Sequence, residues 1–329
     1  MKVFFPLIVV AAIILVPIIG VAAEMYFLFG VLIPYLALIT FVVGFTLKIL
    51  DWAKSPVPFR IPTTCGQEKT LPWIKQNKIE NPSTMSGVIA RMALEVLLFR
   101  SLFRNTKAEL NEQGDLVYRS SKWLWLGGLV FHWSFLVIIL RHYRFFVEPV
   151  PFFVTMLEGL DGFVQIMLPT FYLSNVAILA GITYLLLRRI VASQIRYISL
   201  PNDYFPLYLI GAIAVSGILM RYVYKVDVTG VKSLVQGLVT FQFSTPTGVD
   251  GIFYVHLFLV CVLAMYFPFS KLMHMGGVFF SPTRNLANNC REKRHINPWN
   301  PEIKIRSYKE YEEDFREKMK GAELPLEKG

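Results

Sequence analysis

The sequence predicts an all-α protein, a polytopic transmembrane helix bundle of six helices with both termini cytoplasmic. Hydrophobic residues make up 54% of the 329-residue chain and charged residues only 17%, an apolar excess too large for an ordinary soluble domain of this size. A helix needs about 20 apolar residues to cross the hydrocarbon core of a membrane. Runs of that length lie near residues 3–22, 25–50, 123–146, 163–187, 206–225 and 252–273.

Each run is expected to be a helix, because backbone groups in lipid must be satisfied within their own segment and none of the runs alternates like a barrel strand. The first run also has features of a signal peptide, with Lys2 before it and the small residues Ala22 and Ala23 at its end. Its apolar core is longer than the roughly 7 to 15 residues of a signal peptide. We therefore expect the first run to be a transmembrane helix.

Lysine and arginine are distributed unevenly between the two sides of the predicted bundle. If Met1 is cytoplasmic, 28 of the 33 Lys and Arg residues fall in cytoplasmic segments. This bias predicts that both termini are inside and that the chain is a multi-pass protein of the cytoplasmic (inner) membrane. Contact with anionic membrane lipid accounts for the net charge of +10, so no nucleic-acid partner is expected. The few basic residues left outside are Arg141, Arg144, Arg221, Lys225 and Lys232.

The predicted crossings divide the chain into four parts. In the first cytoplasmic segment, several prolines prevent a continuous helix, and an amphipathic helix is expected to start from Ser83 or Ser86. The C-terminal tail is polar and contains a helix with charge pairs four residues apart. The expected parts are two N-terminal transmembrane helices (1–50), a cytoplasmic loop with an amphipathic helix (51–121), a four-helix core (122–275) and a cytoplasmic tail (276–329).

The three cysteines, Cys65, Cys261 and Cys290, form no Cys-x-x-Cys or Cys-x-x-Cys-His motif. This spacing excludes the usual covalent c-type haem attachment, and it argues against an iron–sulfur cluster held by this chain, which would need several thiolates. Buried or idle thiols are expected at all three positions, although Cys65 and Cys290 could also touch a partner. Any iron chemistry must therefore use histidine.

Four of the five histidines are expected on only two of the predicted helices, the third and the sixth, with His274 at the inside end of the sixth. These two helices are three crossings apart and therefore antiparallel, so His132 shares its depth with His274 near the inside, and His142 shares its depth with His256 near the outside. Neutral imidazole is a standard axial ligand of haem iron. We expect each pair to bind one haem b, an inner haem at the first pair and an outer haem at the second. Pro268 is expected to kink the sixth helix and thus shorten the long spacing between its two histidines.

Other functions must be weighed against this prediction. A single histidine in a membrane helix is often a hydrogen-bonded core residue, but four residues matched in depth on two helices are hard to obtain by chance. Intramembrane histidines can also relay protons in a transporter, and a passive anchor could hold a single haem. Counting haem per chain separates the three: none in a transporter, one in an anchor, two in an electron-transfer protein.

The histidine-containing segments "FHWSFLVIILRH" (131–142) and "HLFLVCVLAMYFPFSKLMH" (256–274) resemble the gamma subunit of respiratory nitrate reductase, a membrane anchor with two haems b. An extra first helix and the long loop with "PFRIPTTCGQEKTLPWIK" make the chain similar to the M subunit of the sulfite-reduction-associated Dsr complex, in the same superfamily. The resemblance implies exchange of electrons with menaquinol or menaquinone. It also implies a cytoplasmic iron–sulfur partner like the catalytic subunit of heterodisulfide reductase, further membrane and external redox subunits, and a role in sulfite metabolism. The chain would then be an electron-transfer subunit of a quinone-linked oxidoreductase complex.

Polar residues gather at the outer ends of the predicted helices, and we expect some of them to serve the haem and the quinone. Arg141 and Arg144 flank His142 and could pair with haem propionates. Glu158 and Asp161 could accept a proton from quinol. Ordinary caps and anchors at the membrane interface are the alternative. The full set of candidate quinone-site residues is Glu158, Asp161, Gln165, Arg221 and Lys225.

Overall fold

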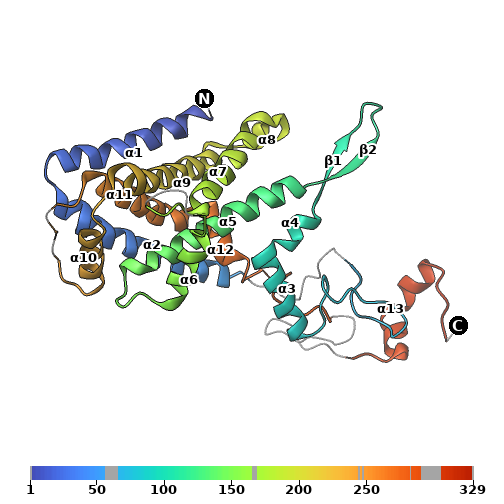
Figure 1. Cartoon of the computed structure of the whole chain (residues 1–329). Helices are drawn as coiled ribbons and strands as arrows, with labels where there is room; N and C mark the ends of the chain where they lie inside the picture. The colour runs from blue at the N-terminus through green and yellow to red at the C-terminus, as the bar shows by residue number, and fades with distance from the viewer. Residues whose placement is uncertain are drawn as a thin grey trace.

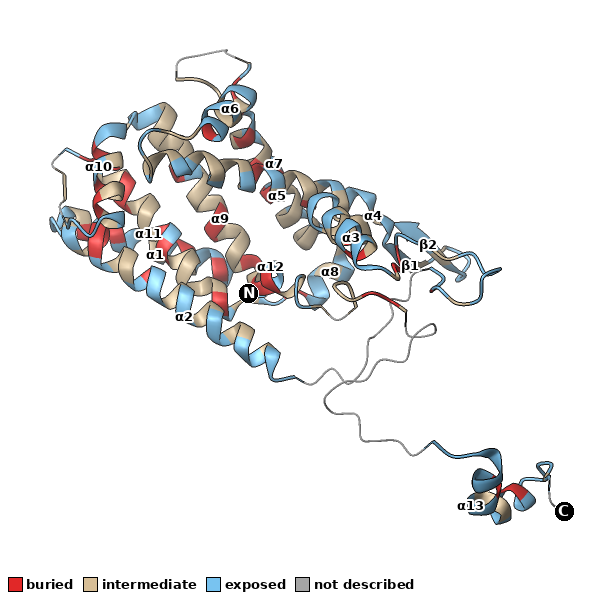
Figure 2. Ribbon diagram, turned by 90° about the horizontal axis from the view of Figure 1, so that it is seen from below, coloured by how far each residue is buried: buried red, intermediate tan, exposed pale blue. Residues whose placement is uncertain are grey.

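The computed structural model describes residues 2–55, 66–164, 169–243, 245–246, 248–281, 283–289 and 305–327. Six helical segments within this part of the chain are long and apolar enough to cross a membrane, as the sequence predicts. Each span buries only 17–28% of its most apolar window inside the protein, so most of its apolar surface faces outward, toward lipid. Figure 2 shows this pattern, with buried residues confined to the faces where helices meet. The chain is a multi-pass membrane protein.

Helix α9 (Pro201–Leu219) lies at the centre of the bundle and packs on α1 (Phe4–Ala22), α7 (Leu173–Val191) and α11 (Gly251–Tyr266). Helix α5 (Lys122–His142) packs along α7, and α2 (Ile33–Ala53) packs along α11 (Figure 1). One buried cluster joins Val10 of α1, Leu209 of α9 and Leu259 of α11. Short π-helical turns extend two of the spans, η1 (Leu28–Leu32) before α2 and η3 (Met220–Tyr224) after α9.

The limits predicted for two of the membrane helices, the fourth and the sixth, are wrong. The fourth was expected over 163–187, but α7 begins only at Leu173, and Glu158 and Asp161 lie on a separate short helix, α6 (Phe152–Asp161). The sixth was expected to continue to residue 273, but α11 ends at Tyr266. Pro268 has no N–H for the helical ladder, and the chain continues in two 3-10 turns, η4 (Phe267–Phe269) and η5 (Lys271–Met273), before α12 (His274–Gly277).

The described part of the first long loop contains more secondary structure than expected. Its amphipathic helix is present as α3 (Met85–Leu98), but Thr84 is the N-cap, since its hydroxyl accepts from the Gly87 N–H at 3.3 Å. After the short helix α4 (Arg100–Arg104), an antiparallel hairpin of β1 (Thr106–Leu110) and β2 (Leu116–Ser120) extends beyond the end of α5 (Figure 1). The sequence analysis did not predict this hairpin.

Residues 66–104 and 283–289 form one unit, which we call the α3 platform. Asn288 donates from its backbone N–H to the Pro82 carbonyl at 2.7 Å and from its amide to the Asn81 side chain at 2.7 Å. Arg91 donates to the Thr283 carbonyl at 3.1 Å. Because these partners lie about 200 residues apart, the start of the tail holds the first loop against the bundle.

The remaining helices are short or peripheral. At the opposite end of the bundle from the α3 platform, α10 (Val228–Val239) packs against η2 (Tyr143–Phe145), and its Leu234 lies in a buried cluster with Phe29 and Tyr254 (Figure 1). Helix α8 (Ser193–Ile198) follows α7 directly. The expected helix of the tail is α13 (Tyr308–Gly321), and Ser307 and Glu310 form a capping box at its start.

Candidate functional site

The four membrane histidines lie in two pairs at different depths of the bundle. The rings of His132 and His274, the inner pair, have their centroids 6.0 Å apart. The rings of His142 and His256, the outer pair, have their centroids 6.3 Å apart. A regular helix would separate residues 256 and 274 by about 27 Å but residues 132 and 142 by only about 15 Å. The end of α11 at Tyr266 removes this mismatch, because the 3-10 turns bring residue 274 back toward α5.

Hydrogen bonds fix the tautomer of every ring in the two pairs. The Nδ1 atoms of three rings lie 2.7–2.8 Å from carbonyl oxygens and must therefore donate: His132 to Gly128, His142 to Ile138 and His274 to Lys271. All three carbonyls belong to the residue three or four positions earlier in the chain, so local helical geometry supplies the acceptor. In each ring, Nε2 is then left without a proton, as a metal ligand requires.

The fourth ring, His256, is oriented by a neighbouring helix. Its Nδ1 lies 2.9 Å from the Ser216 hydroxyl oxygen, and that hydroxyl donates its own hydrogen to the Ile213 carbonyl at 3.0 Å. Nδ1 of His256 is therefore the donor, and Nε2 again remains unprotonated. Gly217 leaves room for the ring, because a Cβ at that position would lie 3.3 Å from His256 Cε1. The sequence analysis missed Ser216, although a hydroxyl within an apolar run is a visible signal.

The geometry of both pairs fits a haem iron between the two rings. A bond from metal to imidazole nitrogen is about 2 Å long, so two imidazoles on opposite sides of one iron have ring centres roughly 6 Å apart. Both pairs have that separation. Among the residues that the structure describes, no group of three or more His, Cys, Asp or Glu side chains could hold a bare metal ion. Two protein ligands per site suit a haem, because the porphyrin supplies the other four.

Ion pairs that join α5 and η2 to α6 engage most of the charged residues expected to serve the outer haem and the quinone. Arg141 contacts Asp161 at 2.6 Å, and Asp161 also accepts from the backbone and hydroxyl of Ser174 at 2.7 and 2.6 Å. Arg144 contacts Glu158 at 2.7 Å. Both carboxylates are thus paired with the arginines that were expected to bind propionates.

The other two described candidates at this end, Arg221 and Lys225, take no part in these ion pairs. Arg221 donates to the Thr170 carbonyl at 3.2 Å and lies 4.2 Å over the ring of Tyr172, whose ring also lies 3.4 Å from the Arg141 guanidinium. Neither Arg221 nor Lys225 forms an ion pair within the part of the chain that the structure describes, and of the two Arg221 is the less exposed. Lys225 is exposed and caps η3 in a left-handed conformation. Gln165 lies outside the described residues, as do Cys65 and Cys290, whereas Cys261 is a buried free thiol.

Comparison with known proteins shows the family to which the chain belongs. Residues 82–291 match the family described as nitrate reductase gamma subunit. A protein of Archaeoglobus fulgidus named Hdr-like menaquinol oxidoreductase cytochrome b-like subunit is 46% identical over 281 residues, which cover 83% of this chain and 84% of the relative. A protein of Archaeoglobus profundus with the same name is 42% identical over 83% of each chain. The matched region contains all four paired histidines, and the chain belongs to the nitrate reductase gamma subunit family.

Proposed function

We propose that this protein is the di-haem cytochrome b subunit of a respiratory redox complex. It would exchange electrons between menaquinol or menaquinone in the membrane and a cytoplasmic iron–sulfur subunit, in a pathway of sulfite or sulfur metabolism. The proposal rests on the two histidine pairs. In each pair the two imidazole rings have their centroids about 6 Å apart, and each ring donates a hydrogen bond from Nδ1. The names of the two relatives, which are menaquinol oxidoreductase subunits, support the same function.

His132 and His274 would hold the inner haem, and His142 and His256 the outer haem. When bound, each haem supplies reversible one-electron chemistry between ferric and ferrous iron. The protein would hold each ring in a fixed orientation through its Nδ1 hydrogen bond. His132 and His256 are half-buried, whereas His142 and His274 are exposed. Because the two pairs lie at different depths, the chain would offer an electron route along the membrane normal.

The outer end of the bundle would receive the quinone. Oxidation of a quinol releases two electrons and two protons, so a proton acceptor is needed beside the head group. Glu158 is the better candidate, because Asp161 already accepts hydrogen bonds from Arg141 and from Ser174. Arg221, which lacks an ion-pair partner among the described residues, is the most available cation for a haem propionate or a quinone oxygen, together with Arg141 and Arg144.

The α3 platform and the hairpin would receive the cytoplasmic partner. The hairpin exposes one apolar face, formed by Leu110, Leu116 and Tyr118, of which 72%, 58% and 70% are accessible. A two-stranded hairpin is marginal in water on its own, and such an exposed face is typical of a protein interaction site. This surface lies at the same end of the bundle as the inner histidine pair, where electrons would leave or enter (Figure 1).

Haem stoichiometry tests the proposal directly. Purified protein should contain two haems b per chain, whereas a proton-relaying transporter would contain none and a passive anchor one. Alanine at His132 or His274 should remove the inner haem, and alanine at His142 or His256 the outer haem, because each iron loses an axial bond. If the His142 and His274 variants lost the same haem, the pairing would be wrong.

Quinone binding at the outer end has its own test. Glu158→Gln should slow haem reduction by a menaquinol analogue while the haem spectrum and content stay unchanged, since glutamine cannot take the proton. Asp161→Asn serves for comparison, because it leaves the buried Arg141 with a weaker partner and should lower stability as well as rate. A wild-type reduction rate in both variants would place the quinone elsewhere.

A further inference from the structure

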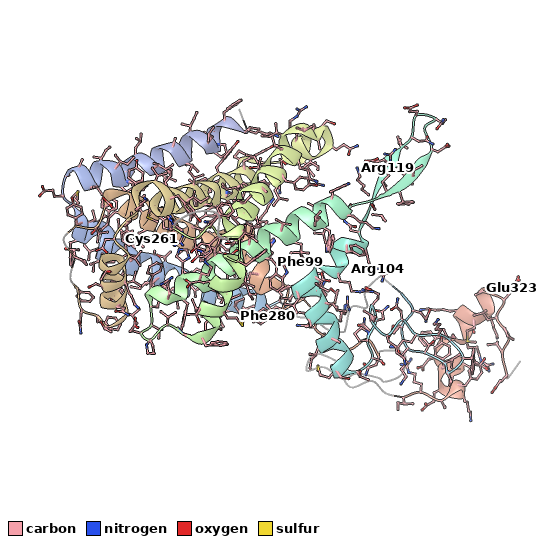
Figure 3. All side chains as sticks on the ribbon, in the orientation of Figure 1. Phe99, Arg104, Arg119, Cys261, Phe280 and Glu323 are labelled. Atoms are coloured by element: carbon pink, nitrogen blue, oxygen red, sulfur yellow. The ribbon has the colours of Figure 1, made fainter. Side chains whose placement is uncertain are left out.

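His132 of the inner pair contacts a residue of the α3 platform as well as its partner, His274. The Phe99 ring lies 5.0 Å from the His132 ring, nearly perpendicular to it at 81°. Phe131, on α5 itself, contacts the same imidazole at 4.9 Å and 86°. In Figure 3, Phe99 lies where the platform meets the bundle. One of the two aromatic neighbours of His132 therefore comes from outside the membrane helices.

Phe99 has a backbone conformation that is unfavourable for a bulky residue. It separates α3 from α4 with φ 49° and ψ 47°, in the left-handed region that favours glycine or asparagine at the end of a helix. Glycine would satisfy the backbone at this position better than phenylalanine does. The contribution of phenylalanine must therefore come from the contact that its ring makes.

Two tryptophans on α5 hold this helix break in place. Trp125 donates from Nε1 to the Leu98 carbonyl at 2.7 Å, and Trp133 donates to the Leu97 carbonyl at 2.9 Å. These carbonyls belong to the last turn of α3, where helical partners are lacking. Because Trp125 and Trp133 lie on either side of His132 along α5, the same helix carries the ligand and anchors the segment that presents Phe99 to it.

The start of α4 is fixed from within the platform. The Glu95 carboxylate accepts from the backbone N–H and the hydroxyl of Ser101 at 3.0 and 2.7 Å. Arg100, the residue directly after Phe99, donates to Glu80 at 2.8 Å. Phe99 thus has anchored residues on both sides, so its backbone cannot move away from His132 without breaking several hydrogen bonds.

We propose that Phe99 is a positioning residue for the inner haem: its ring fixes the plane of the His132 imidazole and keeps water from that side of the His132 ring. This inference rests on the proposed haem ligation. Loss of the ring would let the imidazole rotate and would admit water, and a more polar surrounding favours the more highly charged ferric state. The midpoint potential of the inner haem would therefore fall, and that of the outer haem would stay constant.

Redox titration and electron paramagnetic resonance of the purified holoprotein test the inference. Phe99→Gly removes the ring but keeps the backbone conformation, and Phe99→Leu keeps apolar volume without a planar ring. In both variants we expect the inner haem to show at least a threefold change in its ferrous-to-ferric ratio at a fixed applied potential, which is about 28 mV for a one-electron couple. We also expect a shift of its low-spin ferric signal. Phe99→Tyr, which keeps the ring, should resemble the wild type.

The matched control is Phe103→Leu, since Phe103 lies on α4 but its ring contacts Trp125 edge to face at 4.9 Å, and no contact with a histidine is found for it among the described residues. It should leave both haems unchanged. Loss of the inner haem alone from the Phe99 variants, with the outer haem retained, would also support the inference. An inner haem with wild-type potential and signal in either Phe99→Gly or Phe99→Leu would overturn it. A wild-type protein without haem would instead refute the proposed function.

Discussion

A methyl group added at Gly181 should disturb the packing beside the inner histidine pair. An ideal Cβ on Gly181 would lie 3.1 Å from both Cα and Cβ of Phe131 and 3.2 Å from its backbone nitrogen. Two of these atoms belong to the backbone of α5, which cannot rotate aside as a side chain can. Gly181→Ala should therefore push α7 and α5 apart by a few tenths of an ångström, and Phe131 directly precedes His132.

The magnitude follows from two opposing effects. Overpacking of a tight contact costs about 1–3 kcal/mol, and replacing glycine by alanine inside a helix returns up to about 1 kcal/mol. The matched control is Gly211→Ala on α9, where the nearest atom to an ideal Cβ is Ile182 Cγ2 at an ordinary 3.8 Å. At Gly211, only the gain from replacing glycine by alanine inside a helix should act. The two variants should differ by about 1–3 kcal/mol, with Gly181→Ala the less stable.

Thermal denaturation in detergent, followed by circular dichroism and haem absorbance, measures this difference. At roughly 2–4 °C per kcal/mol, the midpoint of Gly181→Ala should lie several degrees below that of Gly211→Ala. The inner haem should be the first to be lost on heating. Equal midpoints for the two variants would show that α5 and α7 are not packed as tightly as the structure has them.

The remaining predictions concern orientation and the α3 platform. Reporter fusions after Gly329 and within residues 105–115 should both report from the cytoplasm, following the bias in Lys and Arg; an external signal from the loop would reverse the inner and outer haems. Burial alone would raise the pKa of Glu80, but hydrogen bonds and charges from Arg104 and Arg100 outweigh it, so the pKa lies below its ordinary value. The stabilisation from Glu80 is therefore complete above about pH 4.3 and is lost as the pH falls through the lowered pKa. Glu80→Gln should increase the rate of limited proteolysis of the α3 platform at pH 7. In the wild type, that rate should rise only in acid. Equal protection of variant and wild type at pH 7 would contradict this role of Glu80.

The sequence alone determined the class of protein and the residues at its centre. Hydropathy identified all six spans, because burial in lipid imposes a local requirement on each run of about 20 residues. The same local reasoning assigned two histidines to the third span and His256 to the sixth, and antiparallel direction matched His132 with His274 and His142 with His256, although His274 lies on α12, beyond the end of the sixth span. These inferences needed no knowledge of which helices touch.

Only the tertiary structure decided how the second histidine of the sixth span reaches its partner. Proline predicted a kink at position 268, but whether the helix bends or ends depends on its neighbours. A Cβ on Gly44 would lie 2.8 Å from Pro268 Cβ, so α2 approaches closely where α11 breaks. The break, rather than a kink, allows His274 to face His132.

Contacts between segments far apart in the chain could not be predicted from the sequence either. Ser216 meets His256, and Phe99 meets His132, through pairings of helices that no local pattern encodes. The ion pair of Arg141 with Asp161 likewise depends on α6, a short helix that the sequence analysis did not predict. The periodicity of a run reports which face is apolar, whereas the partner of each polar group is set by packing across the bundle.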